Sequence, residues 1–137
     1  MNKVEKVKWD ESLLSGDPRI DVQHKFLVEI INELADAILL EKGRKALGKI
    51  LNMLKYYAAW HFEREEKCMD EVKCTAAMIN KEAHVRFVKV FEGYQKQFLA
   101  NTDVEELSKA MYRTLVDWLV NHIKKVDGQI RTCLHQR

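Results

Sequence analysis

Hydrophobic residues recur every three or four positions along most of the chain, and short polar stretches divide this pattern into four segments. Such spacing places the hydrophobic side chains of each segment on one face of an α-helix. The pattern predicts helices over about residues 18–41, 44–72, 76–99 and 103–134. Because short connections favour antiparallel neighbours, we expect one all-α domain (1–137), an up-down four-helix bundle with an irregular N-terminal arm over residues 1–17.

Two of the predicted helix starts carry capping signals. Asp17 can cap the first helix, and Pro18 suits the first helical position because its missing N–H costs nothing there. Thr102 and Glu105 have the spacing of a capping box, in which both side chains accept hydrogen bonds from backbone N–H groups of the first turn. These signals support the starts of the first and fourth helices.

Polar residues occupy inward positions on all four predicted helices. They are His24 on the first, His61 and Glu65 on the second, Asn80 and His84 on the third, and His122 on the fourth, with Asp127 close to the same face. In an up-down bundle the starts of helices one and three meet the ends of helices two and four. At 1.5 Å per residue, the histidines and acids fall roughly 6 to 18 Å from that shared end. They therefore share one layer.

A metal centre explains why so many ionisable residues face inward. A buried histidine or carboxylate costs several kcal/mol unless something compensates it. Imidazole nitrogen and carboxylate oxygen are ligands that suit iron. His61 and Glu65 are four residues apart, so they lie one turn apart on one face and can reach one ion or two adjacent ions. His122 and Asp127 are five apart, which places Asp127 at the edge of its face.

At these positions the sequence resembles the hemerythrin family, most closely its single-domain bacterial members. The motifs that carry the resemblance are Trp9, Ile20-Asp21-Val22-Gln23-His24-Lys25, His61-Phe62 with Glu65-Glu66 and Met69, His84 with Phe87, and Trp118-Leu119 with His122-Ile123 and Asp127. The resemblance implies a non-haem, carboxylate-bridged centre of two iron ions. It further implies a protein that reversibly binds dioxygen or a similar small diatomic ligand, for storage, delivery or sensing, rather than an enzyme.

The resemblance also implies a role for each site residue. His24 and His61 would bind the iron that takes up oxygen, His84 and His122 would bind the other iron, and Glu65 and Asp127 would bridge the two. An apolar pocket would shelter the open coordination position. The residues matching that pocket are Leu27, Phe62, Trp118, Leu119 and Ile123.

One position departs from the family pattern. The family has a histidine four residues before His84, where this chain has Asn80. Because an asparagine oxygen is a poor replacement for imidazole at iron, we expect the iron held by His84 and His122 to be bound more weakly or to carry a water. Three outcomes stay open: an otherwise normal oxygen carrier, a partly occupied centre, or a centre with peroxidase-like or oxidative activity. Nitric oxide binding is a further alternative.

Composition and spacing argue against other classes of protein. The 23 basic and 21 acidic residues are interspersed, so nucleic acid is not an expected partner. The lysine-rich start leads into the polar residues 9–18, and no apolar run approaches membrane-spanning length; we therefore expect a cytoplasmic protein without membrane contact. A ferritin-like enzyme needs Glu-x-x-His motifs, which this chain lacks. A structural zinc site needs four protein ligands that leave no open position, and these usually include cysteine. A metal-free interaction module would leave the buried charges unexplained.

Smaller expectations concern individual polar residues. Cys68, Cys74 and Cys133 are odd in number and lack the spacing of a zinc ribbon or redox motif, so we expect reduced, packed thiols. The charged group Glu63, Arg64 and Glu66 predicts a solvated face. Asp21 is expected to act as a first-turn acid, with a hydrogen bond that orients His24 as the alternative.

Overall fold

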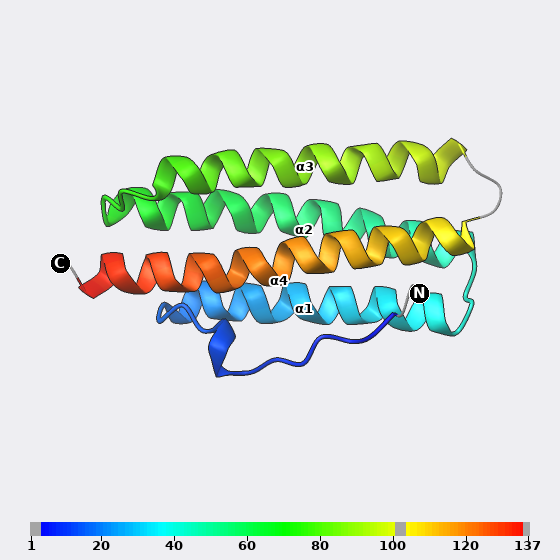
Figure 1. Cartoon of the computed structure of the whole chain (residues 1–137), viewed down its shortest axis with the longest axis horizontal. Coiled ribbons are helices and arrows are strands. Elements are labelled where there is room, and N and C mark those ends of the chain that lie inside the picture. Colours follow the sequence, from blue (N-terminus) through cyan, green and yellow to red (C-terminus); the bar gives the residue numbers. More distant parts are fainter. Residues whose placement is uncertain (1–3, 101–103, 136–137) are drawn as a thin grey trace.

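Four long antiparallel helices form the computed structural model of this chain, which confirms the predicted fold class (Figure 1). The structure describes residues 4–100 and 104–135, apart from the side chains of Asp127, Leu134 and His135. The helices are α1 (Pro18–Leu39), α2 (Arg44–Glu71), α3 (Ala77–Ala100) and α4 (Glu105–His135), and a short 3-10 helix, η1 (Glu11–Leu13), precedes them. Among the described residues, no helix combines the length and the apolar composition needed to cross a membrane.

The helix ends follow local chemistry. The Asp17 carboxylate accepts a hydrogen bond from the Arg19 backbone N–H at 2.9 Å, which confirms the predicted cap of α1. Gly43, at a φ of 91°, adopts the left-handed conformation that closes the turn between α1 and α2. Thr102 lies outside the described residues, so its capping box with Glu105 stays a prediction.

The inward faces of the helices form two hydrophobic clusters with a polar layer between them. The larger cluster includes Leu27, Ala58, Phe87 and Leu119. The smaller cluster, at one end of the bundle, includes Ile20, Met69, Val126 and Ile130. The predicted polar positions fall between these two sets on α1, α2 and α4. Burial of the hydrophobic stripes therefore forces the polar side chains into the interior, at one common depth.

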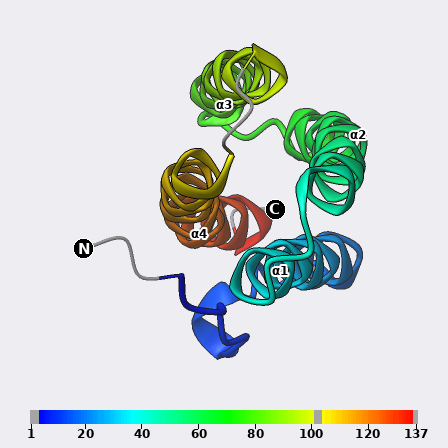
Figure 2. The same cartoon turned by 90° about the vertical axis from the view of Figure 1, so that its right-hand side faces the viewer.

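The N-terminal arm packs against α1 and α4, which lie next to each other around the bundle (Figure 2). The Val7 backbone donates to Asn32 Oδ1 at 2.8 Å, and Asn32 Nδ2 donates back to the Val7 carbonyl at 2.9 Å. The Tyr112 hydroxyl of α4 donates to the Glu5 carbonyl. These contacts fix an irregular segment by pairing its backbone groups with helical side chains.

The expectation of three reduced thiols is wrong. Cys74 and Cys133 form a disulfide across a sequence separation of 59 residues, whereas Cys68 is a buried free thiol. Cys74 lies in the connection between α2 and α3, and Cys133 lies in the last turns of α4. The two positions meet only after the bundle forms, so spacing along the chain did not reveal the pair. Because disulfides persist mainly in oxidising compartments, the bond gives no support to the expected cytoplasmic location.

Candidate metal centre

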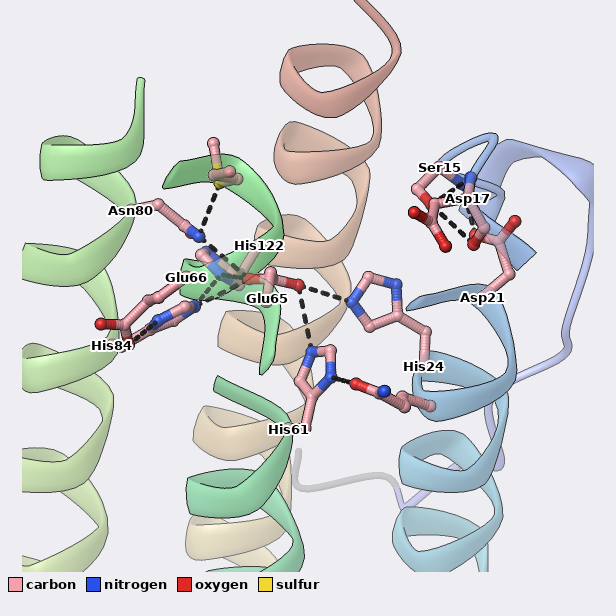
Figure 3. Close-up of polar contacts among 12 residues, drawn as sticks. Ser15, Asp17, Asp21, His24, His61, Glu65, Glu66, Asn80, His84 and His122 are labelled. Carbon is pink, nitrogen blue, oxygen red and sulfur yellow. Dashed lines mark hydrogen bonds and ion pairs between the residues drawn. The ribbon is translucent and has the colours of Figure 1, made fainter. Parts of the chain in front are cut away.

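Five of the six predicted metal ligands meet in the polar layer. Figure 3 shows Glu65 of α2 between His24 and His61 on one side and His84 and His122 on the other. Two groups of possible ligand atoms share the Glu65 carboxylate: His24, His61 and Glu65, and Glu65, His84 and His122. No member is more than 8% exposed. The backbone of Asp127 belongs to α4, but its side chain lies outside the described residues, so its bridging role stays a prediction.

The Glu65 carboxylate faces four imidazole nitrogens, two at each oxygen. Its Oε2 lies 2.9 Å from His24 Nε2 and 3.1 Å from His61 Nε2. Its Oε1 lies 2.8 Å from His84 Nε2 and 3.4 Å from His122 Nε2. The two last nitrogens are 3.0 Å apart. One carboxylate is thus placed to contact two neighbouring cations, each with two imidazoles.

The outer nitrogens of two rings have partners that fix where the ring proton sits. His84 Nδ1 lies 2.9 Å from Glu66 Oε2, and a carboxylate at neutral pH only accepts, so Nδ1 is the donor. His61 Nδ1 donates to Gln23 Oε1 at 2.7 Å in the same way. In a neutral ring, Nε2 is then an unprotonated acceptor that faces another acceptor, an oxygen of Glu65. Such a contact is repulsive unless a cation is shared by the two atoms.

The protonation states favour cation binding. Burial lowers the pKa of His61 and of His122, with Glu65 opposing the effect, so both rings favour the neutral form that binds metals. Burial raises the pKa of Glu65, but the charge of His61 and hydrogen bonds from His122 and His24 outweigh it and hold that pKa well below its usual range. Burial thus favours the neutral, metal-binding form of His61 and His122, beside a Glu65 carboxylate that favours the ionised form.

The spacing of the donor atoms fits metal ligands. Ligand atoms bound at roughly 2.1 Å and at right angles stand roughly 3 Å apart. The separations between the Glu65 oxygens and the four imidazole nitrogens, 2.8 to 3.4 Å, agree with that value. Neither group contains cysteine, which structural zinc sites usually have. Nitrogen and oxygen donors without cysteine are more typical of iron or manganese sites.

The match to a protein family explains this donor set. Residues 15–133 match the family model described as the hemerythrin HHE cation binding domain. The chain belongs to the hemerythrin family. Its polar layer is the cation-binding His/Glu site of a hemerythrin-like protein.

Hemerythrin relatives match the chain over most of its length. A bacteriohemerythrin of Pseudomonas aeruginosa is 33% identical over 122 residues, covering 88% of this chain and 76% of that protein. A bacteriohemerythrin of Methylococcus capsulatus is 35% identical over 114 residues, covering 83% and 85%. A solved structure of a hemerythrin variant with a leucine-to-tyrosine substitution is 31% identical, with a TM-score of 0.82 over 93% of this chain and 96% of that one.

Asn80 lies within the hemerythrin site, 2% exposed. Its Nδ2 lies 3.1 Å from Glu65 Oε1 and 3.0 Å from the sulfur of Met69, and donates toward both. Its Oδ1 is buried and has no hydrogen-bond partner among the described residues. The amide therefore turns its nitrogen toward the Glu65 carboxylate and leaves its oxygen, the atom of an amide that binds metals, without a hydrogen-bond partner among the described residues.

Two site residues were missed by the sequence reasoning. Glu66 was expected on a solvated face, but its side chain is only 29% exposed and holds His84, so that expectation is wrong. Glu63 and Arg64 are exposed, as predicted. Gln23, which holds His61, directly precedes His24; a buried amide beside a candidate ligand was the available signal.

Asp21 anchors the arm rather than a ring. Its carboxylate accepts a hydrogen bond from the Ser15 backbone N–H at 2.6 Å, on the side of α1 where the arm arrives (Figure 3). The alternative expectation, that Asp21 orients His24, has no support in the described contacts. The acid of the first turn thus connects the arm to the helix that carries His24.

The predicted pocket residues surround the rings. Four of them are at most 4% exposed, and Trp118 is half-buried; the four are Leu27, Phe62, Leu119 and Ile123. Phe62 stacks on His84 with ring centroids 3.9 Å apart, and Trp118 stacks on His122 at 4.6 Å. These contacts hold the rings in place, while a role in holding a diatomic ligand stays a prediction.

Proposed function

We propose that this hemerythrin-family protein holds two iron ions in the polar layer and reversibly binds dioxygen or a similar small diatomic ligand. One observation carries the proposal: the buried, ionised Glu65 carboxylate faces four imidazole nitrogens at distances of 2.8 to 3.4 Å. The similarity to bacteriohemerythrins of two bacteria supports it. Storage, delivery and sensing would all use this same centre.

Each residue has a role in this proposal. Iron bound at the site would supply the redox chemistry for reversible oxygen binding. His24 and His61 would hold one ion, His84 and His122 the other, with Glu65 and Asp127 as the bridges. Gln23 and Glu66 orient two of the rings through their Nδ1 atoms. The stacked Phe62 and Trp118 hold the rings of His84 and His122 in place.

A second candidate function is peroxidase-like or oxidative activity, and Asn80 favours it. Where the family pattern has a histidine, Asn80 donates to Glu65 and presents no imidazole to the ion of His84 and His122. That ion would keep a position open to water or to a small ligand. Nitric oxide binding would use the same open positions.

Metal analysis combined with absorption spectra tests the proposal. Protein loaded with ferrous iron without oxygen is assayed for iron per chain, exposed to air, and then returned to vacuum. Two irons per chain and an absorption band that appears and disappears reversibly would support a carrier. Steady consumption of hydrogen peroxide with an electron donor would instead support the enzyme. A chain that retains no iron in any of these conditions contradicts both functions.

A further inference from the structure

A cavity of about 250 Å³ opens between α3 and α4 and reaches the cation site. Its lining includes Asn80 and His122 at the deep end, with Arg86, Lys125 and the Trp118 ring around them. His122 is a member of the His84 group, so the cavity touches a candidate ligand directly. The volume suits a ligand of only a few non-hydrogen atoms, because pockets for drug-sized molecules are larger.

The α1–α2 side of the site is closed by comparison. A cavity of about 350 Å³ lies on that side, but its lining includes Gln23 and neither His24 nor His61. The Gln23 amide, bonded to His61 Nδ1, stands between this cavity and the ring. The exposed fractions of the histidines support this difference in access, since His24 and His61 are 0% and 1% exposed and His122 is 8% exposed. A ligand from solvent therefore has its more direct path along α3 and α4.

The cavity is positively charged. Arg86 of α3 and Lys125 of α4 line it, both are exposed, and the described residues that line it include no aspartate or glutamate. Neither cation forms an ion pair with any residue that the structure describes. Two unpaired cations near a mouth raise the local concentration of anions and speed their entry. The lining thus selects an anion over a cation.

The deep end offers room and an unsatisfied polar atom. Asn80 is shorter than an imidazole, and it turns its nitrogen toward Glu65 and Met69. Its Oδ1 has no hydrogen-bond partner among the described residues, so a water or a ligand hydroxyl could donate to it. A small ligand at this end would lie beside His122 and the cation that His84 and His122 hold.

We propose that the cavity between α3 and α4 is a binding site for a small anion, which enters past Arg86 and Lys125 and reaches the cation site at Asn80 and His122. The anion is of the size of azide, nitrite or formate. The proposal rests on the proposed function only for the presence of the metal ion. It adds a second route of access, distinct from the iron of His24 and His61 to which the family resemblance assigns oxygen.

Azide titration of the iron-loaded, air-oxidised protein tests the route at constant ionic strength. The readout is the azide dissociation constant from the absorption change, with iron per chain measured on the same sample. The Arg86→Glu/Lys125→Glu double variant should weaken azide binding by about tenfold. Asn80→His should weaken it as well, because the added ring fills the deep end. The matched control is Arg64→Glu/Lys67→Glu at the α1–α2 cavity, which changes the net charge equally and should stay within twofold.

Each outcome of the comparison decides the proposal. Equal weakening of azide binding by both double variants would mean that only the net charge of the protein matters. That result would overturn the proposed anion site. A larger effect of the Arg64→Glu/Lys67→Glu variant, or an unchanged constant in Asn80→His, would also overturn it.

A metal-free experiment separates this site from the proposed function. If the chain retains no iron, the proposed function fails, and the cavity is tested alone by NMR with sodium azide at low salt. Shifts of the side-chain amide signals of Asn80 and Asn121, which both line the cavity, would support the anion site. These shifts should disappear in the Arg86→Glu/Lys125→Glu variant. No shift in the metal-free wild type would overturn the anion site as well.

Discussion

The α1–α2 half of the cation site and the α3–α4 half present the same donor atoms but lie in different surroundings. Each half directs two Nε2 atoms at one oxygen of Glu65. The α1–α2 half is sealed behind the neutral amide of Gln23. The α3–α4 half has the charged Glu66 as its outer partner, contains Asn80, and meets a cavity. The asymmetry thus lies in the surroundings of the four imidazoles.

The difference in outer partners has a chemical consequence. A carboxylate that accepts the Nδ1 proton of a ligating histidine makes that ring a stronger donor than an amide does. Glu66 would therefore make His84 a stronger ligand in the half where Asn80 supplies no imidazole. We interpret Glu66 as a partial compensation for Asn80, because its contact with His84 would help to keep a second ion bound.

Removing the charge of Glu65 should abolish metal binding in both halves, because both halves share its carboxylate. Glu65→Gln leaves the two pairs of rings without the carboxylate that they share, so we expect iron per chain to fall from two to near zero, measured by mass spectrometry after loading. Glu63→Gln is the matched control, since it makes the same change at an exposed position of the same helix and should retain both ions. Retention of iron by Glu65→Gln, with helical circular dichroism intact, would contradict the bridging role.

Breaking the Cys74–Cys133 disulfide should destabilise the end of the bundle where the α2–α3 connection meets the end of α4. Cys74→Ser opens a loop of 59 residues, and loop-closure entropy predicts a loss of roughly 4 kcal/mol in the free energy of unfolding. Urea unfolding of the metal-free chain measures it. Dithiothreitol should lower the stability of the wild type by a similar amount and leave the Cys74→Ser variant unchanged. An equal effect of reductant on both proteins would contradict this account.

The sequence predicted the symmetric part of the site better than the asymmetric part. Helical periodicity and the rise per residue bring His24, His61, His84 and His122 to one depth, because both depend only on local geometry. Glu66 lies one residue after Glu65, so its side chain is rotated by about 100° from the inward face. Its contact with His84 depends on how α3 lies beside α2, which no local pattern encodes.

The disulfide was hidden for the same reason. Cys74 and Cys133 belong to a turn and to the end of a helix, and only the packing of α4 against the α2–α3 connection brings them together. What the sequence did indicate was the departure at Asn80. Its location in the layer agrees with the expectation, but the direction of its amide could be known only from the structure.

Restoring a histidine should make the two halves more alike. Asn80→His adds an imidazole beside His84 and His122, so we expect the second iron to dissociate about tenfold more slowly during dialysis against a chelator. The stability of any oxygen adduct should rise with it. The first iron, held by His24 and His61, should be released at an unchanged rate and is the internal control. Unchanged retention and unchanged adduct stability in Asn80→His would contradict the view that Asn80 weakens this half.

Exchanging the outer partners should give the smallest and most selective change. Glu66→Gln replaces the carboxylate on His84 by an amide, as Gln23 already provides for His61, and should weaken the second ion by roughly tenfold or less. Gln23→Glu should strengthen the first ion, because a buried carboxylate there would make His61 a stronger donor, although its burial offsets part of the gain. Competition with a coloured chelator measures both affinities, with Glu63→Gln as the surface control. Opposite effects on opposite halves would show that the outer partners set the asymmetry, whereas a loss at both ions in either variant would show that these side chains serve mainly to hold the bundle together.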